Sequence, residues 1–437
     1  MIFRRVSLVF STDWLLFFMC NPLFPTKLTI ESILFKIDPE FNFNYTMPKI
    51  SQHAEYVILS LALCLGVLST ALASPLYPIY VQSWHVSTTE IGYAFVAYMI
   101  GVVFTLLFFN QFTNRYGFKK IVCIGLGLCV IALIYSALAS NIYHLCSARF
   151  LIGISSGLLS TSTMVGLSLK YPFSNPAIAG KVTSILTVFG FSLGPLVGGL
   201  IADHTSYPLV MPYVVIMCFS LITLMLCFLI NYQHQPPTQY EHSKVWNIPQ
   251  HPKSKNIFFP CAVAALCGFA VFSLYAALSG NFLATLPIPQ SATLTGISIS
   301  VILFISAFAQ FFFKAIDESK SLIIGLILLL LGCYLLIASQ SFENFYLLAC
   351  SILSIGLGHG FTLNPAYYLI TRMTKSENPA IFSTFLLIAY QGTIWPVLLS
   401  SSLIDYFGIP VALTLFSFII LFSAIWIIYQ VKQIELS

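Results

Sequence analysis

The sequence predicts an all-α integral membrane protein with twelve transmembrane helices in two pseudo-symmetric halves of six helices each. Three observations support this fold class. Of the 437 residues, 58% are hydrophobic and only 8% are charged, too few to cover a soluble protein. Apolar runs of about 20 residues, the length that crosses a bilayer, recur along the chain. Basic residues fall in alternate loops, and short motifs recur at a nearly constant offset.

The predicted spans follow one another through short loops from residue 55 onward. Helices are expected because a helix satisfies all its backbone hydrogen bonds within lipid. In chain order the spans are roughly 55–80, 91–111, 119–140, 143–169, 177–202, 209–231, 257–284, 291–313, 321–339, 345–371, 379–404 and 409–431.

Basic residues support this number of spans. After residue 46, every Lys and Arg except Arg149 falls in loops or tails that share one side of the predicted bundle, which we call the basic end. These are Lys49, Arg115, Lys119, Lys120, Lys170, Lys181, Lys244, Lys253, Lys255, Lys314, Lys320, Arg372, Lys375 and Lys432. A miscounted span would mix the two sides. The positive-inside rule then predicts an inner or plasma membrane protein with both termini in the cytoplasm.

Residues 1–46 fit this pattern poorly. Arg4 and Arg5 precede an apolar stretch that Asp13 interrupts, and no clear small-residue cleavage site follows, unlike a signal peptide. One hypothesis is that Met47 is the true start; the alternative is a mobile or interfacial tail. Recovery of residues near Ile2 from the native protein would rule out the first.

The remaining chain divides into a first half (47–231), a cytoplasmic linker (232–256) and a second half (257–437). His234, His242 and His251 lie in the linker at spacings that match no common metal-ligand pattern, so we interpret it as solvated. The eleven cysteines include no CxxC pair, and most lie in apolar segments, where they are typical of small buried hydrophobes. The sequence thus indicates no metal and no cofactor.

The two halves resemble copies of one unit, because four features recur at nearly the same offset. The repeated features are Asn175-Pro176-Ala177-Ile178 with Asn378-Pro379-Ala380-Ile381, Gly153 and Gly157 with Gly356 and Gly360, Ala62-Leu63-Cys64 with Ala265-Leu266-Cys267, and Asp203 with Asp405. A duplicated six-span unit is a common plan of secondary transporters, with the substrate site at the interface of the repeats.

The fifth span contains the stretch GFSLGPLVGGLIAD, which is unusually rich in helix-breaking residues. Gly190, Gly194 and Gly198 are four residues apart and so share one helix face. In a membrane, small residues on one face allow helix backbones to approach closely, and neighbours tolerate the bend at Pro195. We therefore expect this span to pack its glycine face against another helix.

This stretch resembles motif C of the major facilitator superfamily, a pattern associated with its antiporters. The match includes Gly190, Gly194, Pro195, Gly198 and Gly199. The fourth span reads ARFLIGISSG, similar to motif B, with Arg149, Gly153 and Gly157. The resemblance covers residues 55–432 and implies alternating access, in which two six-helix halves rock about a central cavity.

The loop after the second span, NQFTNRYGFKK, resembles motif A of the same family. Arg115, Gly117 and Lys119 match, whereas Asn110, Asn114 and Phe118 replace a glycine, an aspartate and an arginine. The resemblance implies a charged cluster that holds the cytoplasmic side closed, and the uncharged Asn114 weakens that expectation. We expect Asn114→Asp to favour the outward-open state.

Two ionisable residues lie well inside predicted spans. Arg149 is expected at the central cavity by its resemblance to motif B, with snorkelling to the headgroups as the alternative. His359, in GLGHGFTLNP, is a candidate proton relay, and its neighbouring glycines are expected to open space around the ring. The alternative for His359 is a hydrogen-bonded packing residue, and coupling through Glu90 or Asp203, or no coupling, stays open.

Further cavity candidates are polar or aromatic residues of spans that are expected to line the pathway: Tyr77, Asn281, Gln310, Asn364, Tyr390, Gln391 and Trp395. No acidic residue lies in a span interior, which favours neutral, amphipathic or anionic substrates over strongly cationic ones. The favoured function is proton-coupled export of amphipathic compounds by a monomer in the lipid bilayer.

Two alternatives remain at this point. One is a transporter of a single small metabolite that keeps motif C only for packing. The other, more remote, is an intramembrane serine hydrolase, because Gly153–Gly157 formally matches GxSxG with Ser155 as nucleophile and His359 as base. We expect no enzyme activity. We also expect no nucleic-acid partner, because the position of the basic residues is explained by membrane topology.

Overall fold

The computed structural model describes residues 50–109, 112–172, 179–230, 247–312, 316–376 and 380–436. The side chain of Asn114 and those of several helix-end residues are not part of this description. The predictions for residues 1–46, Asn110, residues 175–178 and 378–379, and most of the 232–256 linker therefore fall outside the described residues.

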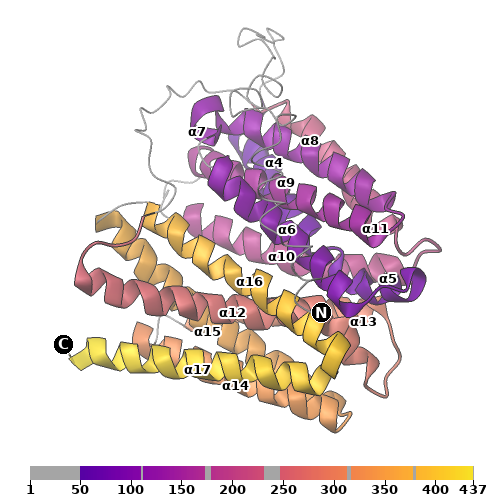
Figure 1. Cartoon of the computed structure of the whole chain (residues 1–437). Coiled ribbons are helices and arrows are strands. Elements are labelled where there is room, and N and C mark those ends of the chain that lie inside the picture. Colours follow the sequence, from indigo (N-terminus) through magenta and orange to yellow (C-terminus); the bar gives the residue numbers. More distant parts are fainter. Residues whose placement is uncertain are drawn as a thin grey trace, which may run out of the picture. The chain divides into compact units, whose positions relative to one another are not determined.

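Every regular element in the described residues is helical. The elements of the first half are α4 (Gln52–Ala71), the short 3₁₀ turn η1 (Ser74–Leu76), α5 (Tyr77–Trp84), α6 (Thr88–Phe108), α7 (Phe112–Tyr116), α8 (Phe118–Ala137), α9 (Ile142–Leu169), α10 (Ala179–Asp203) and α11 (Met211–Cys227). Those of the second half are α12 (Pro252–Ala284), α13 (Ala292–Phe312), α14 (Glu318–Ser341), α15 (Phe345–Ser376), α16 (Ala380–Phe407) and α17 (Ile409–Leu436) (Figure 1).

Apart from the short α7, which lies in the loop after the second span, these helices correspond in order to the twelve predicted spans. Within the described residues, 11 helices are long and apolar enough to cross a membrane, and the first of them, Gln52–Trp84, combines α4, η1 and α5. The sixth predicted span is α11, a shorter apolar helix. The predicted fold class, an all-helical membrane protein with two halves, is confirmed.

Local sequence signals explain where several helices begin and bend. The Ser51 side chain accepts a hydrogen bond from the Ala54 amide at the start of α4, and Ser87 forms a capping box with Glu90 at the start of α6. The first span breaks at η1, where Pro75 lacks an amide donor and a 3₁₀ turn replaces the α-helix. Glu90, a candidate for proton coupling, thus has a capping role here.

The repeated glycines make equivalent contacts in the two halves. A Cβ atom on Gly153 of α9 would collide with the backbone of Tyr98 on α6, and one on Gly356 of α15 would lie 2.9 Å from the carbonyl oxygen of Ile302 on α13. In each half, therefore, the fourth helix packs closely on the second. This agreement supports the duplication that the sequence indicates.

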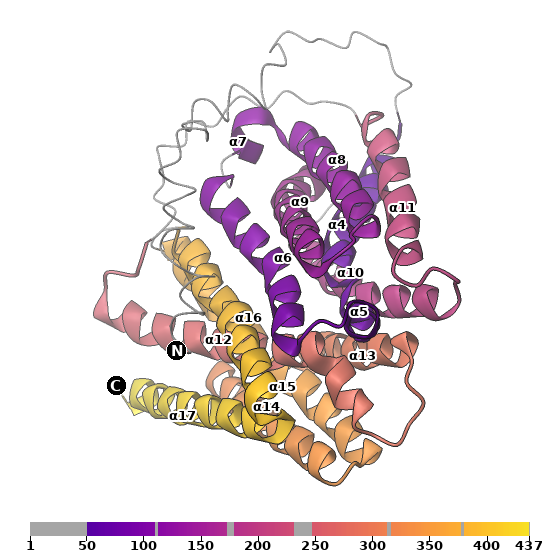
Figure 2. The ribbon, with the colours of Figure 1, turned by 45° about the vertical axis from the view of Figure 1, so that its right-hand side comes forward.

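The two halves meet mainly along two helix pairs. α10 packs against α13, and α6 packs against α16, so the fifth helix of one half always contacts the second helix of the other. Figure 2 shows α6 beside α16 and α10 beside α13. This crossed pairing positions the residues of α4, α6, α10, α12 and α13 around a shared space.

Candidate functional site: a cavity between the two halves

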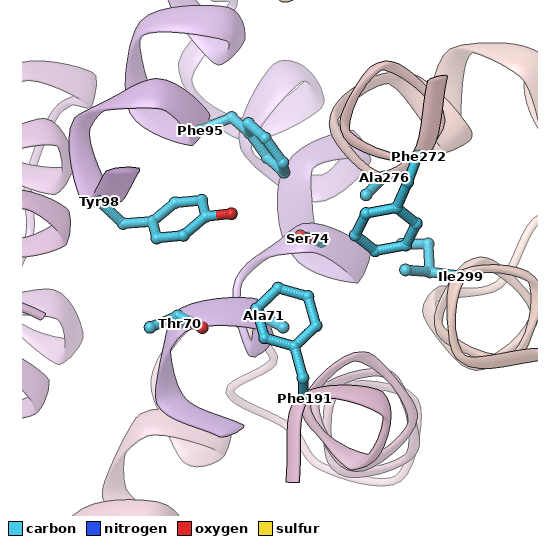
Figure 3. A pocket seen from close by; sticks show the side chains of 9 residues that line it. All are labelled: Thr70, Ala71, Ser74, Phe95, Tyr98, Phe191, Phe272, Ala276 and Ile299. Carbon is cyan, nitrogen blue, oxygen red and sulfur yellow. The ribbon is translucent and has the colours of Figure 1, made fainter. Parts of the chain in front are cut away.

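A small cavity lies where the two halves meet (Figure 3). The first half contributes α4, η1, α6 and α10, and the second contributes α12 and α13. The lining residues are Thr70, Ala71, Ser74, Phe95, Tyr98, Phe191, Phe272, Ala276 and Ile299. The walls are therefore mostly aromatic and aliphatic, with three hydroxyl groups. Such a lining suits a flat, amphipathic molecule, because ligand sites combine apolar walls with a few polar groups.

Arg149 lies directly behind this wall and is fully buried, with 0% of its surface exposed. Its Nε donates to the carbonyl of Ala94 at 3.3 Å, and its Nη1 donates to the carbonyl of Thr70 at 2.5 Å. Its guanidinium carbon lies 4.8 Å from the centre of the Tyr98 ring. Carbonyl dipoles and an aromatic face offset part of the cost of burying this cation. The alternative in which Arg149 snorkels to the headgroups is wrong for this structure.

Tyr98 connects Arg149 to the cavity. The side chain is 3% exposed, one face of its ring is next to the guanidinium, and its hydroxyl points into the cavity (Figure 3). Among the described residues this hydroxyl has no hydrogen-bond partner. The sequence analysis did not select Tyr98. The available signal was Gly153, one turn after Arg149, whose bare backbone lets the Tyr98 segment of α6 approach α9.

His359 occupies the second half, one layer behind the cavity wall. Its Nδ1 is 2.8 Å from the Ser306 hydroxyl, and its ring packs against Phe272, with 5.5 Å between ring centres. In the described part of the chain its Nε2 has no hydrogen-bond partner. Because Phe272 lines the cavity, a single aromatic ring separates His359 from it.

The glycines beside His359 do not open space around its ring, contrary to expectation. A Cβ on Gly358 would lie 2.7 Å from the Leu329 amide nitrogen, and one on Gly360 would lie 2.5 Å from the Ser306 carbonyl oxygen. These glycines instead allow α15 to pack closely on α14 and α13. The ring is enclosed by aromatic neighbours instead.

The other candidate residues fall into two groups. Some lie near Arg149 or His359, and the others lie away from both. Tyr77 is buried near Arg149, and its ring meets Phe95 edge-on. Tyr390 contacts Phe269, which in turn contacts His359. Both tyrosines are therefore close to one of the two ionisable residues behind the cavity wall.

Three candidates lie elsewhere, and two have no described contact that bears on the site. Asn281 donates to the Thr88 hydroxyl at 3.5 Å, near the start of α6. Gln391 binds its own helix and accepts a hydrogen bond from Trp395, whose side chain is largely exposed on the outer surface. Gln310 and Asn364 are half-buried without a described contact to the cavity.

The glycine face of α10 packs on the first span. Cβ atoms on Gly190 and Gly194 would lie 2.9 Å and 2.6 Å from the backbone atoms of Cys64 and Leu68, and Gly198 is equally tight against Leu72. Gly199 lies on another face, where a Cβ would collide with the carbonyl of Ala292 on α13.

A reciprocal contact comes from Gly296 of α13, where a Cβ would collide with the carbonyl of Pro195 on α10. Together these contacts hold α10 closely between its own half and the other half. The motif C residues thereby shape one wall of the cavity, which Phe191 of α10 contributes.

The motif A region makes contacts within the first half. Lys119 Nζ donates to the carbonyls of Phe228 and Ile230, just after the C-terminal end of α11. Gly117 adopts a positive φ of 82° at the start of α8, a conformation that favours glycine. The exposed Arg115 lies over the Tyr116 ring.

Away from the basic end, two aspartates join the halves in equivalent ways. Asp203, the last residue of α10, accepts hydrogen bonds from the amides of Ala292 and Thr293, the first residues of α13. Asp405, near the end of α16, accepts hydrogen bonds from the amides of Thr88 and Thr89, the first residues of α6. Each carboxylate thus caps a helix of the opposite half, where the positive end of the helix dipole favours a negative charge.

At the basic end, Glu55 and Lys170 form a buried ion pair, with 2.9 Å between Oε2 and Nζ. The pair joins the start of α4 to the residue that follows α9. The sequence analysis placed Lys170 among the basic-end residues and did not single out Glu55, because nothing in a linear pattern identifies which charges meet.

The hydrolase alternative is not supported by the geometry. Ser155 is buried, and its hydroxyl donates to the carbonyl of Gly125 at 2.8 Å. His359 binds Ser306 in the other half. Neither residue is in contact with the other, so Ser155 and His359 do not form a nucleophile and base pair.

The class that fold and cavity define is a two-halved helical transporter, and comparison with known proteins identifies the family. The model of the Major Facilitator Superfamily matches residues 59–394. This chain therefore belongs to the Major Facilitator Superfamily. The resemblance that the motifs indicate is thereby confirmed.

Curated relatives match parts of the chain. The riboflavin transporter RibZ of Clostridioides difficile is 23% identical over 155 residues, 35% of this chain and 34% of that protein. The chromaffin granule amine transporter of Rattus norvegicus is 26% identical over 215 residues, 47% of this chain and 39% of that protein. Multidrug resistance protein 2 of Bacillus subtilis is 24% identical over 151 residues, 35% of this chain and 38% of that protein. The matches thus span less than half of these relatives.

Solved structures share the fold over almost the whole chain. A bacterial homologue of the human lysosomal transporter Spinster superimposes with a TM-score of 0.72, covering 88% of this chain and 98% of that one at 12% identity. At this level of identity, the similarity concerns the fold.

Proposed function

We propose that this protein exports small amphipathic molecules by alternating access, in exchange for protons. The observation that carries the proposal is the cavity between the halves, lined by aromatic side chains and hydroxyls from both of them. A site at the interface of two repeats becomes accessible from either side of the membrane when the repeats rock against each other.

The aspartate caps support an alternating cycle. Asp203 and Asp405 join the halves away from the basic end, so breaking these hydrogen bonds is the step that would open this side. We place the basic end in the cytoplasm, following the positive-inside rule. A reporter that fluoresces only in the cytoplasm, fused to the C-terminus, tests this orientation.

His359 supports proton coupling. It is a histidine one aromatic ring away from the cavity, with one nitrogen bound to Ser306 and the other without a partner in the described residues. A histidine ring gains a positive charge when it takes up a proton, so a proton that enters beside the cavity would change the field that a substrate meets.

The test is accumulation of a panel of fluorescent amphipathic compounds in a host that lacks its own efflux pumps. Cells that express this chain should accumulate less dye, and a protonophore should restore accumulation. An unchanged dye level, with the protein verified in the membrane, would contradict export of such compounds.

The second candidate is a transporter of one small metabolite. The small size of the cavity and its few hydroxyl groups favour this candidate, as does the similarity to a protein named as a riboflavin transporter. In that case the dye panel gives no change, whereas one member of a library of labelled metabolites exchanges across the membrane of proteoliposomes.

A further inference from the structure

Two of the three hydroxyl groups that line the cavity, those of Tyr98 and Ser74, have no hydrogen-bond partner among the described residues. The Tyr98 hydroxyl points into the cavity from a side chain that is 3% exposed, and the described residues offer it no partner (Figure 3). By contrast, the Thr70 hydroxyl donates to the Val67 carbonyl at 2.6 Å on its own helix. Buried polar groups are normally hydrogen-bonded, so an unpaired hydroxyl aimed into a cavity indicates a ligand group there.

Arg149 strengthens this donor. The guanidinium lies on the face of the Tyr98 ring, 4.8 Å from its centre, and its Nη2 also has no hydrogen-bond partner among the described residues. A cation on the ring face draws electron density from the phenol, which makes its O–H a better donor to a negatively charged acceptor. Tyr98 touches the cavity, and Arg149 acts on it from behind.

No carboxylate neutralises this charge within the first half. The sequence has no Asp or Glu from residue 91 to 202, nor from 56 to 89, and Glu90 caps its own helix. Among the described residues of this half, Glu55 is paired with a base, Lys170, at the basic end. In a medium of low dielectric constant, an uncompensated positive charge favours an anion in the cavity and disfavours a cation.

The cavity walls add a preference for a flat ring. Phe95 comes from α6, Phe191 from α10 and Phe272 from α12, so aromatic surfaces face the Tyr98 hydroxyl from both halves (Figure 3). Ring surfaces of this kind stack with or meet the edge of an aromatic ligand.

We propose that the cavity recognises aromatic carboxylates, with Tyr98 as the residue that binds the carboxylate and Arg149 as the residue that polarises and positions Tyr98. This inference rests on the proposed function and names its substrate class. The cavity is small in this conformation, so the ligand enters as the halves move apart. Its carboxylate accepts a hydrogen bond from the Tyr98 hydroxyl when they close.

Binding to purified full-length protein, measured by ligand-induced thermal stabilisation without any gradient, tests the proposal. Three probes share one naphthalene ring and differ in their polar group: a carboxylate, a carboxamide and a methylammonium. We expect the carboxylate to bind about tenfold more tightly than the carboxamide, as for a charge-assisted hydrogen bond, and the methylammonium to bind most weakly.

Tyr98→Phe keeps the ring and its contact with Arg149 but removes the hydroxyl. It should lower carboxylate affinity about tenfold and reduce the carboxylate-to-carboxamide ratio towards one. The matched control is Tyr275→Phe, because Tyr275 is equally buried and its hydroxyl also has no partner among the described residues, but it does not line the cavity.

Equal binding of the three probes, or an unchanged ratio in Tyr98→Phe, would overturn the assignment, as would the absence of binding by all three. These results are independent of the export assay. Carboxylate binding without dye export would contradict the proposed drug export alone, and dye export without carboxylate preference would contradict the substrate class alone.

Discussion

At the scale of single residues, Arg149 is a cation held inside the bundle, and no carboxylate of the described residues contacts it. The break in the first span lies just after Thr70, whose carbonyl accepts a hydrogen bond from the guanidinium. Its charge is thus stabilised by backbone dipoles and by the Tyr98 ring. Replacing any of these partners would leave a buried charge less well solvated, which is costly.

His359 is the residue for which coupling and packing roles can be separated. His359→Gln keeps a polar group that can bind Ser306 but cannot take up a proton. We expect gradient-driven transport in proteoliposomes to be lost, while exchange of labelled for unlabelled substrate without a gradient is retained.

The control for His359 is His204→Gln, because His204 is exposed at the end of α10, away from the cavity. It should leave both activities unchanged. If His359→Gln still accumulated substrate against its gradient, the histidine would have a packing role and coupling would lie elsewhere.

At the scale of elements, α10 shows how bare backbone determines helix contacts. Gly199→Ala would place a Cβ against the Ala292 carbonyl, an atom that cannot rotate away, so α10 and α13 would have to separate. Overpacking of this kind costs about 1–3 kcal/mol. We expect a lower melting temperature and weaker closure at the end that Asp203 caps.

Gly127→Ala is the matched control, because a Cβ on Gly127 meets nothing within 4 Å. Thermal unfolding of both purified variants measures the difference. Equal melting temperatures would show that the α10 and α13 contact adapts without cost.

At the scale of the whole molecule, two carboxylates join the halves through helix starts. We expect Asp203→Asn and Asp405→Asn each to weaken this closure by about 1 kcal/mol, or about fivefold in the equilibrium, because each loses a charged cap. The double variant should show the sum. Spin labels at Tyr207 and Phe342, exposed residues of opposite halves, report the distance between the halves.

The labels require removal of the exposed Cys218 and Cys350. Glu343→Gln is the control, because this acidic residue is exposed and no contact between the halves in the described part of the chain involves it. An unchanged distance distribution in the double variant would mean that packing of α10 on α13 and of α6 on α16 is sufficient to close this end.

The sequence by itself determined the class of fold and its number of spans. Bilayer thickness requires runs of a set length, and membrane insertion sorts basic residues to one side, so both signals are linear. The same holds for the interior position of Arg149 and for the glycine face of α10. These are properties of one segment and need no knowledge of its neighbours.

Only the tertiary structure decided which groups meet. Tyr98 of α6 contacts Arg149 of α9, Glu55 forms an ion pair with Lys170, and each aspartate caps a helix of the other half. The glycines beside His359 proved to be packing sites for neighbouring helices. Such contacts depend on the rotation and approach of separate helices, which side-chain shape and close packing set in three dimensions, so no pattern within one segment can specify the partner.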